Sequence, residues 1–247
     1  MHNVAPSRAL ARRTRQWLTF AFVVAAIGIF VAVVGLALFV IPLTAPGSAS
    51  AGLFGTLRVG VLALGVLIFF IALGLCIRAL TLRKDNDLAM IVGRFLTQYL
   101  DNRYHFVRHV SKRNLGYVDA ILVGPPGALV FRILDNRGAF INEGANWIRQ
   151  DQYGQVTAAG IDPTRECVLD VKKLREYLEA RQLGSVPVYG VVVFTKDEPA
   201  VQLVAKEPVV PITTLRSLVA TLGSNYLARD RIDPGKITTV VRLLVES

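Results

Sequence analysis

The sequence predicts an α/β domain preceded by a hairpin of two membrane-spanning helices. Residues 17–43 run for 27 positions without a charge, and residues 57–80 are nearly as apolar. From residue 85 the composition becomes globular, with charged side chains of both signs. Strand-like and helix-like apolar patterns then follow one another along residues 85–247, which is typical of a sheet covered by helices.

Charge divides the chain in the same place. The 247 residues are 53% hydrophobic and carry a net charge of +10. Residues 1–82 hold six basic and no acidic side chains, so the other 22 basic and 18 acidic residues give the rest only +4. Most of the basic excess therefore belongs to the membrane part, and nucleic acid is a weakly supported partner. Two cysteines, Cys76 and Cys167, and three scattered histidines indicate neither a disulfide framework nor a zinc site.

Each apolar segment is long enough to cross a bilayer, since about 20 helical residues span the ~30 Å hydrocarbon core. A cleaved signal peptide is the alternative for the first segment, because basic residues precede it and residues 48–51 resemble a cleavage site. The apolar core of a signal peptide has only about 7–15 residues, so the sequence favours a true span.

The flanking charges predict the topology. Residues 1–16 form a basic arm that we expect to be disordered away from lipid headgroups, and residues 44–56 form an uncharged linker. Four arginines precede the first span and three basic residues close or follow the second, whereas one arginine marks the connecting side. Positive charge favours the cytoplasmic side, so we expect both termini and residues 85–247 in the cytoplasm and the linker outside.

Small residues recur along the first span at spacings of four, three, four and three. Apolar helices are often rich in Ala and Gly, so the pattern has a trivial interpretation. It also favours close helix contact in lipid, either with the second span or with another membrane protein. The stripe consists of Ala21, Ala25, Gly28, Ala32 and Gly35.

Residues 117–138 are the centre of the predicted domain. They form two apolar strands joined by the turn Gly-Pro-Pro-Gly at residues 124–127. Asp119 lies in the first strand and Arg132 in the second, where a buried charge is costly unless it is paired or serves a site. The residues alone favour an Asp119–Arg132 ion pair. Further strands are predicted at 104–110, 139–142, 188–195 and 209–212, and residues 143–160 are predicted to be turn-rich.

Helices are predicted around this sheet. Residues 87–100 have helical periodicity, and Asp162 before Pro163 predicts the start of a helix that ends near residue 182. Two further helices are predicted at 214–222 and 234–246. The 163–182 helix should bury Val168, Val171, Leu174 and Leu178.

Other polar residues are expected to face solvent. His105 and His109 have no nucleophile beside them in the sequence. The charged residues of the 163–182 helix alternate in sign, which predicts a solvated, self-paired face. These residues are Arg165, Glu166, Asp170, Lys172, Lys173, Arg175, Glu176 and Glu179.

The order of these motifs over residues 87–222 resembles the NERD (nuclease-related) domain, which is found in many bacterial proteins and is often attached to membrane spans. The matching motifs are the leading helix, YVDAILVG at 117–124, ALVFRILDNRG at 128–138, Trp147, DPTRECVLDVKKL at 162–174 and VYGVVVF at 188–194. The resemblance implies a restriction-endonuclease-like core sheet flanked by helices.

The resemblance also implies a place for a catalytic site. In such folds a carboxylate on one strand and a Glu-x-Lys on the next hold a divalent metal and a water. Asp119 matches the carboxylate, but Arg132 and Leu134 occupy the Glu and Lys positions. Asp135 cannot replace the glutamate, because strand alternation turns it away from their face. The implied site is degenerate, with no catalytic residue, metal or cofactor expected.

The sequence therefore predicts a multi-pass protein of the bacterial inner membrane whose NERD-like domain is a pseudoenzyme. It would act as a binding or scaffolding module, or as an accessory subunit that meets another membrane protein through its helices in the lipid bilayer. One alternative is a nuclease dependent on Mg²⁺ or Mn²⁺, with Asp119 as a ligand. The other is a non-catalytic nucleic-acid-binding protein at the membrane, whose affinity would fall steeply with salt.

Overall fold

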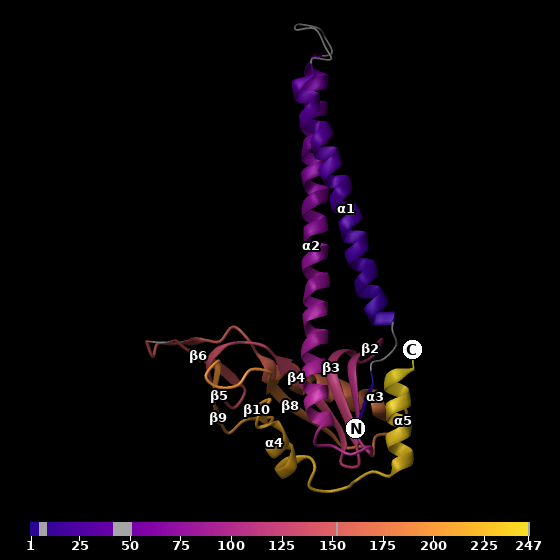
Figure 1. Ribbon diagram of the computed structural model, residues 1–247, viewed down its shortest axis with the longest axis vertical. Helices are drawn as coiled ribbons and strands as arrows, with labels where there is room; N and C mark the ends of the chain where they lie inside the picture. The colour runs from indigo at the N-terminus through magenta and orange to yellow at the C-terminus, as the bar shows by residue number, and fades with distance from the viewer. Residues whose placement is uncertain (5–8, 42–50, 152, 247) are drawn as a thin grey trace. The chain divides into compact units, whose positions relative to one another are not determined.

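The computed structural model describes residues 1–4, 9–41, 51–151 and 153–246 (Figure 1). The chain divides into two compact units: a helical unit, Ala9–Lys84, and an α/β unit formed by Met1–Arg8 with Asp85–Ser247. The division coincides with the change of composition near residue 85. The predicted α/β class, with helices flanking sheets and two long apolar helices near the N-terminus, is confirmed.

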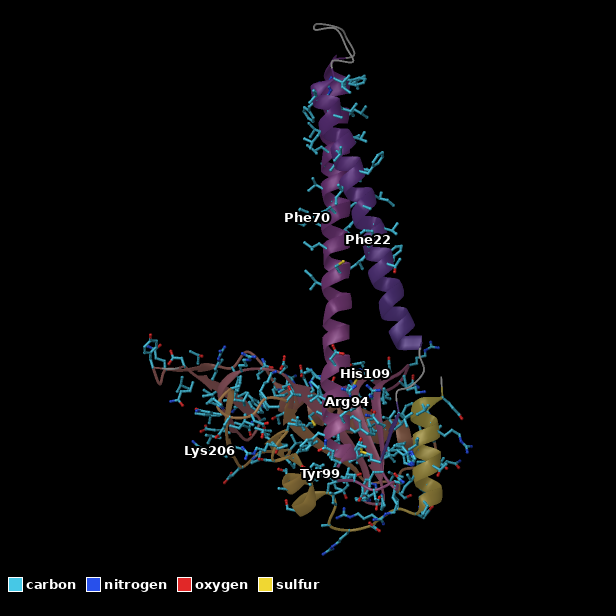
Figure 2. The ribbon with its side chains drawn as sticks, in the orientation of Figure 1. Phe22, Phe70, Arg94, Tyr99, His109 and Lys206 are labelled. Carbon is cyan, nitrogen blue, oxygen red and sulfur yellow. The ribbon has the colours of Figure 1, made fainter. Side chains whose placement is uncertain are left out.

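The helical unit contains α1 (Ala9–Val40) and the first part of α2 (Ala51–Thr97). Within these helices, Thr19–Val40 and Gly52–Ile77 are long and apolar enough to cross a membrane by length and composition. Their side chains are largely exposed, and Figure 2 shows Phe22 and Phe70, which are 73% and 61% exposed, projecting from the helices. Helix α2 begins at Ala51, inside the predicted linker, because the small, uncharged residues at the end of that linker adopt a helical conformation. Residues 42–50, which include the end of the predicted first span and the first half of the predicted linker 44–56, lie outside the described residues.

Glycines bring α1 and α2 into close contact within the helical unit. A Cβ atom added to Gly28 would lie 2.8 Å from the backbone nitrogen of Phe69, and one added to Gly65 would lie 2.4 Å from that of Ala32. Only glycine permits this approach, because side-chain carbon atoms essentially never come so near to backbone. Of the small-residue stripe, Ala21, Gly28 and Gly35 are buried, and Ala25 and Ala32 are half-buried.

The α/β unit is built on a six-stranded sheet of order β1-β2-β3-β4-β8-β10. Strands β2, β3 and β4 form an antiparallel meander, and β1, β8 and β10 add to it in parallel. The predicted central hairpin is β3–β4, and the predicted buried strand is β8, at the centre of the parallel part. The strands are β1 (His2–Val4), β2 (His105–Lys112), β3 (Gly116–Gly124), β4 (Gly127–Leu134), β8 (Val188–Phe194) and β10 (Ile212–Thr214).

Strand β1 corrects the expectation that residues 1–16 are a disordered arm. His2–Val4 pairs in parallel with the start of β2, and the ring of His2 stacks on that of His105 with 5.0 Å between centroids. Helix α1 then begins at Ala9, also inside the predicted arm. Three residues are too few to show strand alternation, and the partner strand is about a hundred residues away, so no local pattern predicts this pairing.

A second sheet, of order β7-β6-β5-β9, corrects two further expectations. The stretch of residues 143–160 was expected to be turn-rich, but it contains two strands, and β9 was not predicted. Strands β5 and β9 pair in parallel, and Lys206 Nζ lies 2.7 Å from Glu143 Oε1 across them (Figure 2). Short strands between glycine turns lack a clear period, which is why the sequence suggested one sheet. The strands are β5 (Gly138–Glu143), β6 (Asn146–Gln150), β7 (Val156–Ala158) and β9 (Val201–Lys206).

Helices cover both faces of the six-stranded sheet. On one face, α3 and α5 pack against side chains that include Ile121 and Val130. On the other face, α4 and the last turns of α2 pack against side chains that include Leu122 and Phe131. The polar strand positions considered below therefore face one helix layer or the other. The helices are α3 (Pro163–Glu179), α4 (Leu218–Asn225) and α5 (Pro234–Val245).

Helix α3 begins as predicted, and its buried face is confirmed at Leu174 and Leu178 but is wrong at Val168. The Asp162 side chain caps it by accepting a hydrogen bond from the backbone N–H of Arg165 at 3.2 Å. Leu178 is buried as expected, but Val168 is 39% exposed and Cys167 is fully buried in its place. In the first half of the helix the buried positions are thus Cys167 and Asp170, while Val171 is half-buried.

Candidate functional site

The candidate site lies on the face of the sheet that α3 covers. Ala120 of β3 is paired with Phe131 of β4, which brings Asp119 and Arg132 to adjacent positions on the two strands. Side chains alternate along a strand, so Asp119 shares a face with Ile121, and Arg132 shares one with Val130. Both neighbours belong to the core beneath α3. The predicted pair therefore points into a covered site.

Arg132 joins two carboxylates from different elements. Its Nη1 lies 3.6 Å from Asp119 Oδ1, and its Nη2 lies 2.6 Å from Glu166 Oε2 on α3. Asp119 also accepts a hydrogen bond through Oδ2 from the backbone N–H of Ile133 at 3.0 Å. The Asp119 side chain is only 8% exposed, against 26% for Arg132 and 49% for Glu166. One guanidinium thus holds a buried carboxylate and a more open one together.

Two further groups of α3 surround this network. Asp170 is buried, and that burial raises the pKa of its carboxyl although Arg132 opposes the change. Burial likewise raises the pKa of the Cys167 thiol to about 12, with a contribution from the negative charge of Asp170. Burial alone would lower the pKa of Arg132, but Asp119, Glu166 and Asp170 outweigh it and raise the pKa. The thiol is therefore protonated and the guanidinium is firmly charged at neutral pH.

The positions of Glu166 and Asp170 correct the prediction of a solvated, self-paired face. Glu166 pairs with Arg132 of β4 and Asp170 is 7% exposed, whereas Lys172 and Glu176 form the kind of helix-surface pair that was expected, at 3.9 Å. The signal in the sequence was the i, i+4 spacing of Glu166 and Asp170, which continues to the buried Leu174. That spacing places all three on one face of the helix.

His109 is a further correction, because it is buried and not on the surface. The pairs Arg108–Ala120 and Val110–Val118 bracket it, which places it across from Asp119 on β2. Its exposed fraction is 8%, its φ is +53°, and its Nδ1 lies 2.9 Å from the Tyr117 hydroxyl oxygen. His105 is half-buried. His109 therefore lies at an interruption of the β2–β3 ladder, which single-strand patterns could not predict.

Leu134 and Asp135 are the remaining residues that were considered for the implied catalytic motif. Leu134 follows Arg132 on the same face of β4 and packs at the edge of a core cluster that contains Phe194 and Trp147. Asp135 Oδ1 lies 3.6 Å from Lys196 Nζ. An apolar side chain thus occupies the position that the resemblance assigns to a catalytic lysine, and Asp135 has a cation of its own.

The donor set around Asp119 does not fit a divalent metal. Such a metal requires several converging oxygen ligands, and its charge is repelled by a neighbouring cation. Here the guanidinium of Arg132 lies between Asp119 and Glu166. In the part of the chain that the structure describes, no three His, Cys, Asp or Glu side chains are grouped so that they could hold a metal ion.

Comparison with known proteins agrees with the arrangement of these elements. The sequence model of the nuclease-related domain family, NERD, matches residues 85–195, which include α3, the β3–β4 hairpin and β8. No curated protein and no solved structure matches the chain. The match begins where the helical unit ends and covers every residue of the Arg132 network. Residues 85–195 of this chain are thus similar to the nuclease-related domain of the NERD family.

Proposed function

We propose that this chain is a membrane-anchored NERD protein whose domain binds or scaffolds other molecules and does not cleave nucleic acid. The observation that carries the proposal is the guanidinium of Arg132, 3.6 Å from Asp119 and 2.6 Å from Glu166. It takes the place of the cation that such a carboxylate pair would otherwise attract. The site is then a structural ion pair network within a nuclease-related fold.

The magnitude of the repulsion supports this proposal. Two unit charges about 4 Å apart interact by roughly 4 kcal/mol at the effective dielectric constant near a protein surface, so a divalent cation at that distance from Arg132 would be repelled by roughly 8 kcal/mol. The same estimate gives an attraction of roughly 8 kcal/mol to one carboxylate at that distance, so Arg132 cancels about half of what Asp119 and Glu166 together would supply to the metal. Leu134 moreover has no amine to position or deprotonate a water.

Titration of the full chain in detergent with Mn²⁺, followed by calorimetry, tests the proposal. We expect no saturable binding by the wild type and no Mn²⁺-dependent cleavage of DNA or RNA. An Arg132→Glu variant, which adds a third carboxylate beside Asp119 and Glu166, should gain Mn²⁺ affinity. Saturable wild-type binding that Asp119→Ala abolishes would return the protein to the metal-dependent nucleases.

The proposed location is a bacterial inner membrane, with both termini and the domain in the cytoplasm. Its support is the length and apolar character of Thr19–Val40 and Gly52–Ile77, and the excess of arginine before the first of them. A green fluorescent protein fused after residue 247 should fluoresce in cells, and alkaline phosphatase inserted in the linker should be active. The opposite pair of results would reverse the orientation.

The proposed partner is another membrane protein. The glycines of the small-residue stripe on α1 are already in contact with α2. Such a partner would therefore bind to the outward faces of the two helices, where Phe22 and Phe70 are exposed. Purification in mild detergent should recover a stoichiometric partner. Recovery of the chain alone as a monomer would count against the accessory-subunit role.

A further inference from the structure

An arginine on β2 lies apart from the Arg132 network, on the opposite face of the sheet. Arg108 is paired with Ala120, whose side chain belongs to the core beneath α2 and α4. Arg108 is half-buried, and its Nε is buried without a hydrogen-bond partner. Buried N–H groups are nearly always paired, so a guanidinium in this state points to a ligand that completes it.

A second arginine lies beside it on α2. Gly93 lets the helix approach the strand closely, since a Cβ atom there would lie 2.9 Å from the Phe106 ring. Phe106 and Arg108 share a face of β2, and Arg94 directly follows Gly93 on the helix (Figure 2). The pKa of Arg108 is lowered by its burial and then by the positive charge of Arg94. Two like charges are therefore held close enough to repel one another.

No acidic side chain of the described residues forms an ion pair with Arg94 or Arg108. Arg132, whose Nε is likewise buried without a hydrogen-bond partner, is by contrast neutralised by Asp119 and Glu166. Repulsion together with desolvation makes the Arg94–Arg108 site unfavourable without a counter-charge. The missing component is an anion.

We propose that Arg94 and Arg108 form a binding site for a phosphate group. Two guanidinium groups carry a charge of +2, which one phosphate dianion neutralises, whereas a single carboxylate leaves +1. The forked N–H donors of arginine match the tetrahedral oxygens of phosphate in bidentate geometry. The phosphate belongs to a soluble phosphorylated molecule or to the headgroup of an anionic lipid. This site does not depend on whether the domain cleaves nucleic acid.

The test is thermal unfolding of the full chain in detergent, with inorganic phosphate as the probe and chloride at equal ionic strength as the reference. We expect phosphate to raise the wild-type Tm by about 3–5 °C, because binding to the native state alone stabilises it. Arg108→Met should melt above the wild type in chloride, because it removes the repelled charge, and should not respond specifically to phosphate. Arg113→Gln, at an exposed turn arginine between β2 and β3, is the matched control and should respond like the wild type.

Arg94→Gln provides a second variant that keeps the interior intact, since Arg94 is exposed. Calorimetry should show its phosphate affinity reduced by at least about tenfold, as expected for loss of a charge-assisted contact. An equal response of the wild type, Arg108→Met and Arg94→Gln to phosphate would overturn the site, as would a response no larger than that to chloride.

Nanodiscs separate the two sources of the phosphate. If the ligand is a headgroup, discs that contain phosphatidylglycerol should raise the wild-type Tm above that in pure phosphatidylcholine, and Arg108→Met should abolish the difference. If it is a soluble phosphate, the lipid composition should have no effect while inorganic phosphate retains its effect. Absence of both effects would refute the proposal.

Discussion

Replacement of Arg132 by methionine isolates the energetics of the candidate site. The variant keeps most of the apolar stem but removes the guanidinium that joins β4 to Asp119 and Glu166. Glu166 is half-exposed and can turn into solvent, so its loss of a partner costs little. Asp119 is 8% exposed and cannot do so. The cost of the change therefore falls on one buried carboxylate.

The structure sets the size of this cost. Breaking a buried ion pair by removing one partner typically destabilises a protein by about 3–5 kcal/mol. Here the Nη1–Oδ1 distance of 3.6 Å is longer than that of a strong charge-assisted hydrogen bond, and Asp119 keeps its bond from the Ile133 N–H. We therefore expect Arg132→Met to lower the free energy of unfolding by about 2–4 kcal/mol. A double variant with Asp119→Asn should recover most of that loss, because no buried charge is then left unpaired.

Urea unfolding of the full chain in detergent measures both values. Fluorescence of Trp147, which is packed against Phe194 in the α/β unit, reports on the domain in a Trp17→Phe background. Arg113→Met is the control for loss of an exposed arginine and should leave the midpoint unchanged. An Arg132→Met variant with the wild-type midpoint, or a double variant less stable than the single one, would refute the reasoning.

Three further experiments test other parts of the structure. Asp170→Asn should stabilise the domain at neutral pH and lose this advantage in acid. Burial raises the folded-state pKa of Asp170, so ionisation of this carboxyl destabilises the folded state as pH rises above the unfolded value near 3.8. Urea midpoints of the wild type and the variant, measured across pH, test this prediction. Gly65→Val should separate α1 from α2, because the new side chain would collide with the backbone of Ala32. Gly60→Val is the control and should leave the helices together, because an added Cβ atom there has no neighbour within 4 Å. Distances between spin labels on the two helices measure the separation. Cys167, with a pKa of about 12, should resist alkylation in mild alkali until the domain unfolds, and mass spectrometry of the labelled peptide would reveal any earlier reaction.

Local patterns in the sequence were sufficient for several elements. The absence of charge over residues 17–43 predicted a helix long enough to span a membrane, and α1 contains one. The turn at residues 124–127 and the apolar strands around it predicted the β3–β4 hairpin, and with it the Asp119–Arg132 pair. Asp162 before Pro163 predicted the start of α3. Each of these features depends on residues close together in the chain, so composition, spacing and turn chemistry are enough to specify it.

The tertiary structure alone decided the rest of the site. Glu166 and Asp170 approach Arg132 only because α3 packs across β4, and His109 lies across from Asp119 only through the register of β2 on β3. The parallel pairs β5–β9 and β1–β2 likewise join segments about sixty and a hundred residues apart. A local pattern states which face of an element is apolar, but the choice of neighbour minimises the free energy of the whole packed chain. No single segment of the sequence therefore specifies which side chains from distant elements come into contact.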